Sequence, residues 1–401
     1  MYPQRAVPTY QYYRDAFRGR PMPFAFVDLD LFQANIDQTI AQAGTKRVRV
    51  ASKSIRVFAL LETILAASPV FQGVMCFSAP EAVWLSRRGL DDLLLGYPVW
   101  HPEQVAAVCA EVRQGKQIVL MIDSVEHVEH LAAIAAREGV TLPVCLDLDV
   151  SLDLPGLHFG VWRSPVRTPD DALRVLAAIE RSGHLRLDGV MAYEAQIAGV
   201  GDNAPGQGPK NALIRVLQRR SVRLVAARRA AVVRALTERG ARLRFVNGGG
   251  TGSVETTVRE PAVTEVTVGS AFFAPTLFDA YRAFRYLPAA GFAVEIVRRP
   301  RADIYTCLGG GYVASGSAGP EKLPQPYLPA GAALLPLEGA GEVQTPVRYR
   351  GGERLALGDP IFMRHSKAGE LCERFDRLLL VSGGRVVGEA LTYRGEGQAF
   401  L

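Results

Sequence analysis

Short apolar runs alternate along most of the chain with segments whose apolar residues recur at helical spacing. Eight runs are typical of buried strands, and they cover residues 48–51, 73–76, 92–96, 118–122, 143–147, 187–193, 243–247 and 265–269. Residues 215–240 have apolar residues at roughly helical spacing, which predicts an amphipathic helix. These residues are Val216, Leu217, Val222, Leu224, Val225, Val232, Val233 and Leu236. Strands that alternate with helices predict βα units on a parallel sheet. Eight such units favour a closed (β/α)8 barrel, the TIM barrel, over an open doubly wound sheet.

Both ends of the chain depart from this alternation. An additional apolar run, residues 24–30, precedes the eight. After about residue 290 the helical spacing fades, and runs such as 360–364 and 377–393 are typical of strands joined by tight turns. We therefore expect a barrel over residues 31–288 and a C-terminal all-β domain over 289–401, with an N-terminal segment over 1–30. Residues 198–211 and 309–331 are too long for simple connectors, and each is either a functional loop or a mobile one.

Composition narrows the class of protein. The chain has 401 residues, 48% of them hydrophobic and 21% charged, which is close to a globular average. The net charge of +6 comes from arginines spread along predicted helices, so we expect a solvated face and no nucleic acid partner. The chain has no apolar run of 18 residues and no apolar signal core, which predicts no membrane association. Five widely spaced cysteines without a CxxC motif predict a reduced, cytoplasmic protein.

One lysine lies just past the first predicted barrel strand, in "RVRVASKS". In a (β/α)8 barrel the working residues sit at the carboxyl ends of the strands. Lys53 is thus a candidate Schiff-base former, because a partly desolvated amine becomes nucleophilic. The alternative is a lysine that simply points into water.

Glycine-rich turns follow the seventh and eighth predicted strands, in "FVNGGGTGS" (245–253) and "EVTVGSAFF" (265–273). Glycine lets the backbone approach a ligand closely, and successive N–H groups then converge on an anion. TIM barrels commonly bind phosphate with the loops after strands seven and eight. A phosphate site opposite a lysine indicates pyridoxal phosphate (PLP). For either loop alone, a flexible turn without a ligand is the alternative. The candidate residues are Gly248, Gly249, Gly250, Thr251, Gly269 and Ser270.

The opening "PFAFVDLDLFQANI" (23–36) resembles the first motif of the D-threonine aldolase and D-serine dehydratase family, fold-type III PLP enzymes related to alanine racemase. "RVRVASKSIR", the two glycine loops and "GVMAYEAQIAG" resemble further motifs of that family, and the similarity extends over about residues 23–395. The resemblance implies a PLP-binding barrel followed by an all-β domain, with the N-terminal strand joined to that domain, and a homodimer. It also implies that Lys53 carries the cofactor and that Arg49 and Tyr193 help to bind it.

Two departures from the family pattern concern acid–base chemistry and the cofactor ring. Both histidines of the family's lysine motif are replaced, by Ala51 and Ile55. After the fifth strand, His158 stands where the family has an arginine that faces the pyridine ring. A neutral imidazole can hydrogen-bond the ring nitrogen, and a core histidine without such a role is the alternative.

The C-terminal "GDPIFMRHSKAGELCERFDRLLLVSGGRVV" (358–387) is similar to "GDxVxxxPNHxCxxxNLFDxLxVVxxGxVV", whose histidine and following cysteine or aspartate hold a divalent metal. His365 matches the histidine. Cys372, seven residues later, is the candidate second ligand, with Glu370 as the alternative. The expected metal is zinc, which suits an imidazole and a thiolate, or manganese. Whether the metal site is intact stays open at this point.

The resemblance implies a PLP-dependent lyase that acts on D-β-hydroxy amino acids and cleaves them to glycine and an aldehyde. Dehydration to an oxo acid and ammonia, as in D-serine dehydratase, is the first alternative. An amino-acid racemase is a second. A non-catalytic PLP-binding protein is a third, favoured by the loss of the two histidines.

Overall fold

The computed structural model describes residues 8–317 and 319–401. Residues 1–7 of the expected N-terminal segment and residue 318 of the 309–331 loop lie outside the described residues. The domain bounds given above stay a prediction. In the described part of the chain, no helix is both long and apolar enough to span a membrane.

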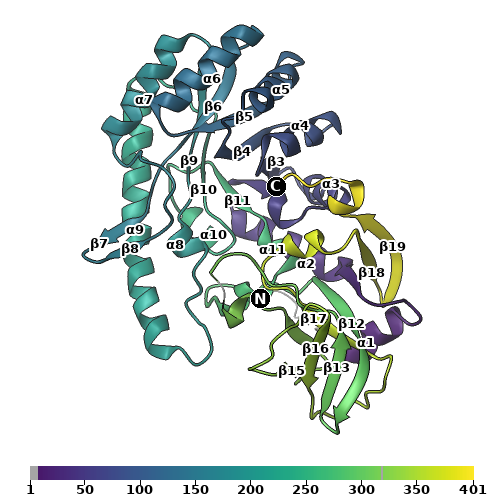
Figure 1. Ribbon diagram of the computed structural model, residues 1–401. Coiled ribbons are helices and arrows are strands. Elements are labelled where there is room, and N and C mark those ends of the chain that lie inside the picture. The colour runs from purple at the N-terminus through teal and green to yellow at the C-terminus, as the bar shows by residue number, and fades with distance from the viewer. Residues whose placement is uncertain (1–7, 318) are drawn as a thin grey trace.

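A closed parallel barrel forms the larger part of the described chain (Figure 1), in the order β2-β3-β4-β5-β6-β9-β10-β11, with β11 paired to β2. Its strands coincide with all eight predicted runs, so the barrel is confirmed. Each strand is nearly continuously apolar because both of its faces are buried. Their bounds are β2 Arg47–Ala51, β3 Phe71–Cys76, β4 Leu93–Pro98, β5 Ile118–Ile122, β6 Leu142–Asp147, β9 Leu185–Ala192, β10 Phe245–Gly248 and β11 Glu265–Val268.

Helices cover the outside of the barrel (Figure 1). The longest, α9, begins at residue 208 and not near 215, because Pro209 is well suited to the first turn of a helix. The end of the expected 198–211 loop is thus helical. The helices are α1 Tyr10–Ala16, α2 Leu29–Ala43, α3 Phe58–Ala67, α4 Ala79–Arg87, α5 Pro102–Arg113, α6 Val125–Glu138, α7 Pro169–Ser182, α8 Ala195–Ala198, α9 Gly208–Glu238, α10 Val254–Thr257 and α11 Ser270–Phe273, with short 3-10 turns at Ser52–Ser54 (η1), Thr276–Ala280, Pro320–Lys322, Glu370–Glu373 (η4) and Arg394–Glu396.

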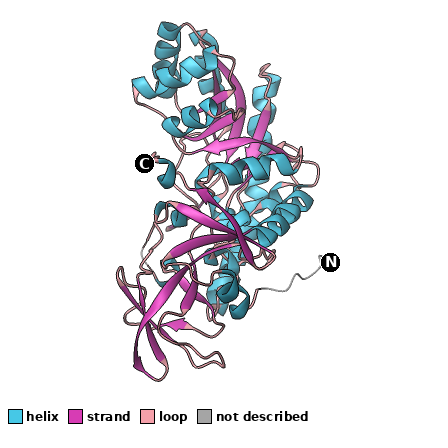
Figure 2. Ribbon diagram, turned by 90° about the vertical axis from the view of Figure 1, so that its right-hand side faces the viewer, coloured by secondary structure: helices cyan, strands magenta, loops and turns pink. Residues whose placement is uncertain are grey.

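A second sheet lies at the end of the molecule opposite α5, α6 and α7 (Figures 1 and 2). Strand β1 (Phe24–Asp28) runs inside it, antiparallel to β12 and parallel to β18. The ninth apolar run therefore belongs to this sheet, as the family resemblance implied. The other strands are β12 Ala290–Arg301, β13 Ile304–Leu308, β14 Gln325–Leu328, β15 Ala333–Leu334, β16 Gln344–Arg348, β17 Pro360–Arg364, β18 Arg377–Ser382 and β19 Arg385–Leu391.

A small hairpin, β7 (Leu152–Leu154) and β8 (Leu157–Phe159), interrupts the connection from β6 to α7. Figure 1 shows it projecting away from the barrel, beside α9. The course of the chain through this hairpin determines which side chains after β6 reach the barrel mouth.

Candidate active site

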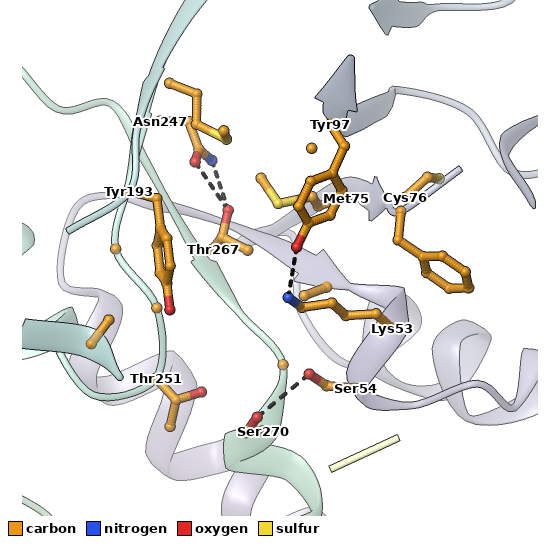
Figure 3. Close-up of a pocket in the computed structure, with 18 of the residues that line it drawn as sticks. Lys53, Ser54, Met75, Cys76, Tyr97, Tyr193, Asn247, Thr251, Thr267 and Ser270 are labelled. Atoms are coloured by element: carbon orange, nitrogen blue, oxygen red, sulfur yellow. Dashed lines mark hydrogen bonds between the residues drawn. The ribbon is translucent and has the colours of Figure 1, made fainter. Parts of the chain in front are cut away.

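A pocket opens at the carboxyl ends of the barrel strands (Figure 3). Seven of the residues proposed from the sequence line it: Lys53, Tyr193, Gly249, Gly250, Thr251, Gly269 and Ser270. Five others do not, and these are Arg49, His158, Gly248, His365 and Cys372. The structure thus gathers the lysine and both glycine loops but separates them from the remaining candidates.

Lys53 lies in the 3-10 turn η1 that directly follows β2. The hydroxyl of Ser52 donates to the carbonyl oxygen of Met75 at 2.9 Å, which ties this turn to the neighbouring strand. The Lys53 side chain is exposed, yet it extends across the pocket, and its Nζ donates to the Tyr97 hydroxyl at 3.0 Å (Figure 3). The ammonium therefore faces the barrel mouth.

Tyr97, at the end of β4, is a pocket residue that the sequence reasoning missed. Burial alone would raise the pKa of its phenol, but the positive charges of Lys53 and Arg163 and the hydrogen bonds to them lower it. The guanidinium of Arg163 lies 5.3 Å from the Tyr97 ring centroid. A phenol with a lowered pKa beside a lysine is suited to acid–base chemistry.

The two glycine loops and the lysine turn are joined by hydroxyl groups. The Thr251 hydroxyl accepts a hydrogen bond from the backbone N–H of Ala271 at 3.1 Å. The hydroxyls of Ser54 and Ser270 lie 3.4 Å apart (Figure 3). Three segments distant in sequence therefore form one connected rim.

This rim fits a phosphate group. A Cβ at Gly250 would lie 3.0 Å from the Ala198 side chain and 3.1 Å from the Tyr193 ring, so only glycine leaves the approach open. In the described part of the chain, the backbone N–H groups of Thr251 and Gly252 donate to no protein atom. Unpaired N–H groups on a glycine-rich turn are the donors that an anion needs.

A buried carboxylate fixes the first glycine loop. Glu194 follows β9 and accepts hydrogen bonds from the Gly249 N–H at 3.1 Å, the Ser253 hydroxyl at 2.9 Å and the Thr257 hydroxyl. The guanidinium of Arg229, fully buried on α9, donates to Glu194 at 2.9 Å and also to Glu260. These pairings offset the cost of burying the charges.

Arg229 corrects the expectation that the arginines of residues 215–240 form a solvated face. It stands four residues after Val225 and three before Val232, so it shares their apolar face. That position was the signal for a buried, paired arginine. Gly248, predicted to bind the cofactor, packs against the same group: a Cβ there would lie 2.8 Å from Arg229 Nη2.

Arg49, also predicted to bind the cofactor, lies inside the barrel and not in the pocket. Its guanidinium donates to both carboxylate oxygens of Glu265, at 2.7 and 3.0 Å, and to Asp92 at 3.2 Å. The side chain is fully buried. Its guanidinium N–H groups donate to carboxylates on β11 and before β4. Arg49 therefore links these two segments inside the barrel.

His158, predicted to face the cofactor ring, is carried away from the mouth by the β7–β8 hairpin. Its Nδ1 bonds Asp153 at 2.6 Å, and its ring stacks on Trp162 with centroids 3.8 Å apart. The chain returns at Arg163, which lines the pocket and donates to Asp147 at 2.9 Å and to the Gly96 carbonyl at 2.8 Å. Arg163 is thus the arginine that faces the pocket, and it stands only five residues after His158.

Among the described residues, no hydrogen bond links His365 to Cys372, the two expected metal ligands. His365 is buried, and neither ring nitrogen has a hydrogen-bond partner among the described residues. Burial and the charge of Arg364 lower the pKa of His365 to about 3. The thiol of Cys372 instead donates to the Ile55 carbonyl at 3.2 Å, and burial raises its pKa to about 12.

The alternative ligand is also engaged: the Glu370 carboxylate accepts from the Ser315 N–H at 3.0 and 3.1 Å. Within residues 8–317 and 319–401, no three His, Cys, Asp or Glu side chains gather in a way that suits a metal ion. Since the Cys372 thiol and the Glu370 carboxylate are each bonded elsewhere, the described residues give His365 no second ligand for a divalent metal.

An outer cleft continues from the pocket toward the second sheet. Its charged lining residues are Lys53, Arg56, Lys210, Lys322 and Lys367 against Glu321 and Glu370. Cations therefore outnumber carboxylates, which favours an anionic ligand.

We predict that the Tyr97 phenol ionises at lower pH than an ordinary tyrosine, because Lys53 stabilises the phenolate. The Tyr97 contribution is the difference in absorbance at 295 nm between the protein and Tyr97→Phe during a pH titration. Lys53→Met should move that ionisation to higher pH, whereas Lys116→Met, a lysine elsewhere on the barrel, should leave it in place. An ionisation unaffected by Lys53→Met would contradict the charge coupling.

Comparison with known proteins assigns this chain to a family. The pattern described as "Alanine racemase, N-terminal domain" matches residues 27–276. A 3-hydroxy-D-aspartate aldolase of Paracoccus denitrificans (strain Pd 1222) is 24% identical over 256 residues, which cover 63% of this chain and 60% of that relative. The matched part thus spans less than two thirds of the relative.

Two solved structures share the fold over nearly the whole chain. A D-threonine aldolase from Filomicrobium marinum superposes with a TM-score of 0.79 at 19% identity, covering 94% of this chain and 95% of the other. A D-threo-3-hydroxyaspartate dehydratase from Delftia sp. HT23 superposes with a TM-score of 0.75 at 19% identity, covering 93% and 98%. Since the family pattern covers more than half of its residues, the chain belongs to the alanine racemase N-terminal domain family.

Proposed function

We propose that the protein is a PLP-dependent lyase that cleaves D-β-hydroxy amino acids to glycine and an aldehyde. The observation that carries this proposal is Lys53 at the barrel mouth, opposite two glycine loops joined to its own turn by hydroxyl groups. The names of the similar proteins, two aldolases and a dehydratase of D-amino acids, support the same substrate class.

The pocket has a group for each part of the cofactor. Lys53 is the candidate for covalent attachment, and the free N–H groups of Thr251, which lines the pocket, and of the adjacent Gly252 are candidates for the phosphate. Arg163 and Tyr193 would be the candidates to contact the cofactor ring, since both line the pocket and the Arg163 guanidinium lies 5.8 Å from the Tyr193 ring centroid. When bound, PLP withdraws electrons from the substrate bond that breaks.

The chain lacks the two histidines of the family's lysine motif. Tyr97 is our candidate for the base in their place. Its phenol lies at the barrel mouth beside Lys53, and the positive charges of Lys53 and Arg163 lower its pKa, so Tyr97 is our candidate to accept the proton of the substrate β-hydroxyl. Tyr193 differs, because burial raises its pKa to about 12 and keeps it protonated. Cleavage needs one base at the β-oxygen, whereas dehydration needs a base at Cα and an acid at Cβ. Tyr97 meets the need for the one base, and we therefore favour cleavage.

We also infer a cytoplasmic homodimer that acts on a small-molecule amino acid. The family resemblance supports the dimer. The five cysteines, Cys76, Cys109, Cys145, Cys307 and Cys372, are all free and buried, which supports a reducing compartment.

The phosphate assignment predicts that Gly250→Val loses pyridoxal phosphate much more readily than Thr251→Val. The valine at 250 fills the approach to the loop, while the change at 251 deletes one hydrogen bond worth about 1 kcal/mol. Cofactor retention is measured from the visible absorbance that remains after gel filtration. Equal retention in both variants would refute the phosphate site.

The reaction is tested by incubating the holoprotein with D-threonine, D-serine, D-3-phenylserine and D-3-hydroxyaspartate and separating the products. We expect glycine and an aldehyde, and we expect Tyr97→Phe to slow their formation while the cofactor absorbance stays unchanged. Formation of an oxo acid with ammonia would indicate dehydration and not cleavage, and formation of an L-amino acid would indicate a racemase. No turnover of any substrate would favour a binding protein.

A further inference from the structure

Counted from His365, Lys367 stands at the position of the second metal ligand in the family pattern quoted above. In the family pattern HxC, one residue separates the histidine from the cysteine, and here the same count leads from His365 through Ser366 to Lys367. A lysine ammonium donates three hydrogen bonds but has no lone pair for a metal. The chain therefore has an amine-bearing side chain where the family pattern, counted from its histidine, has a ligand, and the Cys372 thiol donates to the Ile55 carbonyl instead.

The segment that carries Lys367 is seated on the lysine turn. Gly369 has a φ of +81°, and a Cβ there would collide with the carbonyl oxygen of Lys53. That same carbonyl accepts a hydrogen bond from Arg56 Nε at 3.1 Å, and Arg56 also pairs with Glu373. Segment 365–374 is thus held against the turn from which Lys53 enters the pocket.

Lys367 lines both the hollow beside His365 and the outer cleft that contains Lys53. Its Nζ donates to the Ser315 hydroxyl at 3.0 Å and to the Ser315 carbonyl at 3.4 Å, which are both neutral groups. Among the described residues it enters no ion pair within 4.0 Å. Lys367 also interacts electrostatically with Glu370, Lys322 and Lys53. A half-buried ammonium whose hydrogen-bond partners are neutral can donate to an anionic oxygen at the rim of a cationic cleft.

We propose that the Lys367 ammonium takes the place of the divalent metal and holds the substrate β-oxygen, so that the enzyme works without a metal ion. Lys367 donates a hydrogen bond and transfers no proton, so its contribution is to bind and orient. His365 then packs as a neutral side chain, with its ring edge-on to Phe273 at 6.3 Å between centroids. The substrate part of this inference rests on the proposed function, but the metal part does not.

The metal part is tested by elemental analysis of holoprotein that has been incubated with Mn²⁺ or Zn²⁺ and passed through gel filtration. The natural sequence should retain no equimolar metal. Lys367→Cys restores the HxC spacing and should retain an equimolar ion, which the control His365→Ala/Lys367→Cys should lose. An equimolar ion in the natural protein that His365→Ala removes would overturn the inference, and so would a Lys367→Cys variant without metal.

The substrate part is tested by steady-state kinetics in EDTA. Lys367→Met should raise KM for the best D-β-hydroxy amino acid about tenfold or more, a change of about 1.4 kcal/mol. Lys367→Arg should raise KM less than Lys367→Met does. The cofactor absorbance of both variants should match that of the natural protein. Lys116→Met, which removes a charge far from the cleft, should leave KM unchanged.

An unchanged KM in Lys367→Met, or natural activity that EDTA abolishes and Mn²⁺ restores, would contradict the inference. If the natural protein turns over no β-hydroxy amino acid, the proposed function fails. In that case the metal measurement still tests whether Lys367 stands in place of a metal ligand.

Discussion

The pairing of β11 with β2 closes the barrel, and the candidate site depends on it. The register sets Val268 beside Val50, so the residues that follow the two strands emerge side by side. Ser270 therefore meets Ser54, more than two hundred residues away in the sequence, with hydroxyls 3.4 Å apart. In a parallel barrel all carboxyl ends share one face, and closure makes the first and last strands neighbours. A lysine after the first strand and a glycine loop after the last can then act on one ligand.

Buried ion pairs fix the positions of the glycine loop and the barrel strands more closely than closure of the barrel alone does. Glu194 receives the N–H of Gly249 and is itself held by Arg229 from the opposite side. In the barrel interior, Arg49 links Glu265 on β11 to the segment before β4. Removing one partner of such a pair leaves an uncompensated buried charge, which costs about 3–5 kcal/mol. The site is thus positioned by interactions that tolerate little rearrangement.

The sequence predicted the barrel and the placement of Lys53 and the glycine loops at its mouth, because their signals are local. Apolar runs and a lysine just past a strand can be recognised without knowing any partner, and so can repeated glycines. Arg49 and His158 were assigned from motif position alone, and the structure gives them partners in the barrel interior and on a projecting hairpin. Tyr97 and Arg163 were missed because their roles arise only when β4 and the segment after β8 meet Lys53 at the mouth. The position of Arg229 on an apolar helix face was visible in the sequence but was read as solvated.

The central claim is that Lys53 carries the cofactor at this mouth. It is tested most directly by reducing the pyridoxal phosphate-loaded protein with borohydride, digesting it and identifying the labelled peptide by mass spectrometry. The account predicts one modified peptide that contains Lys53, and no cofactor adduct in Lys53→Ala. A reducible covalent adduct that persists in Lys53→Ala, or a label on Lys367 or another lysine of the cleft in the natural protein, would contradict it.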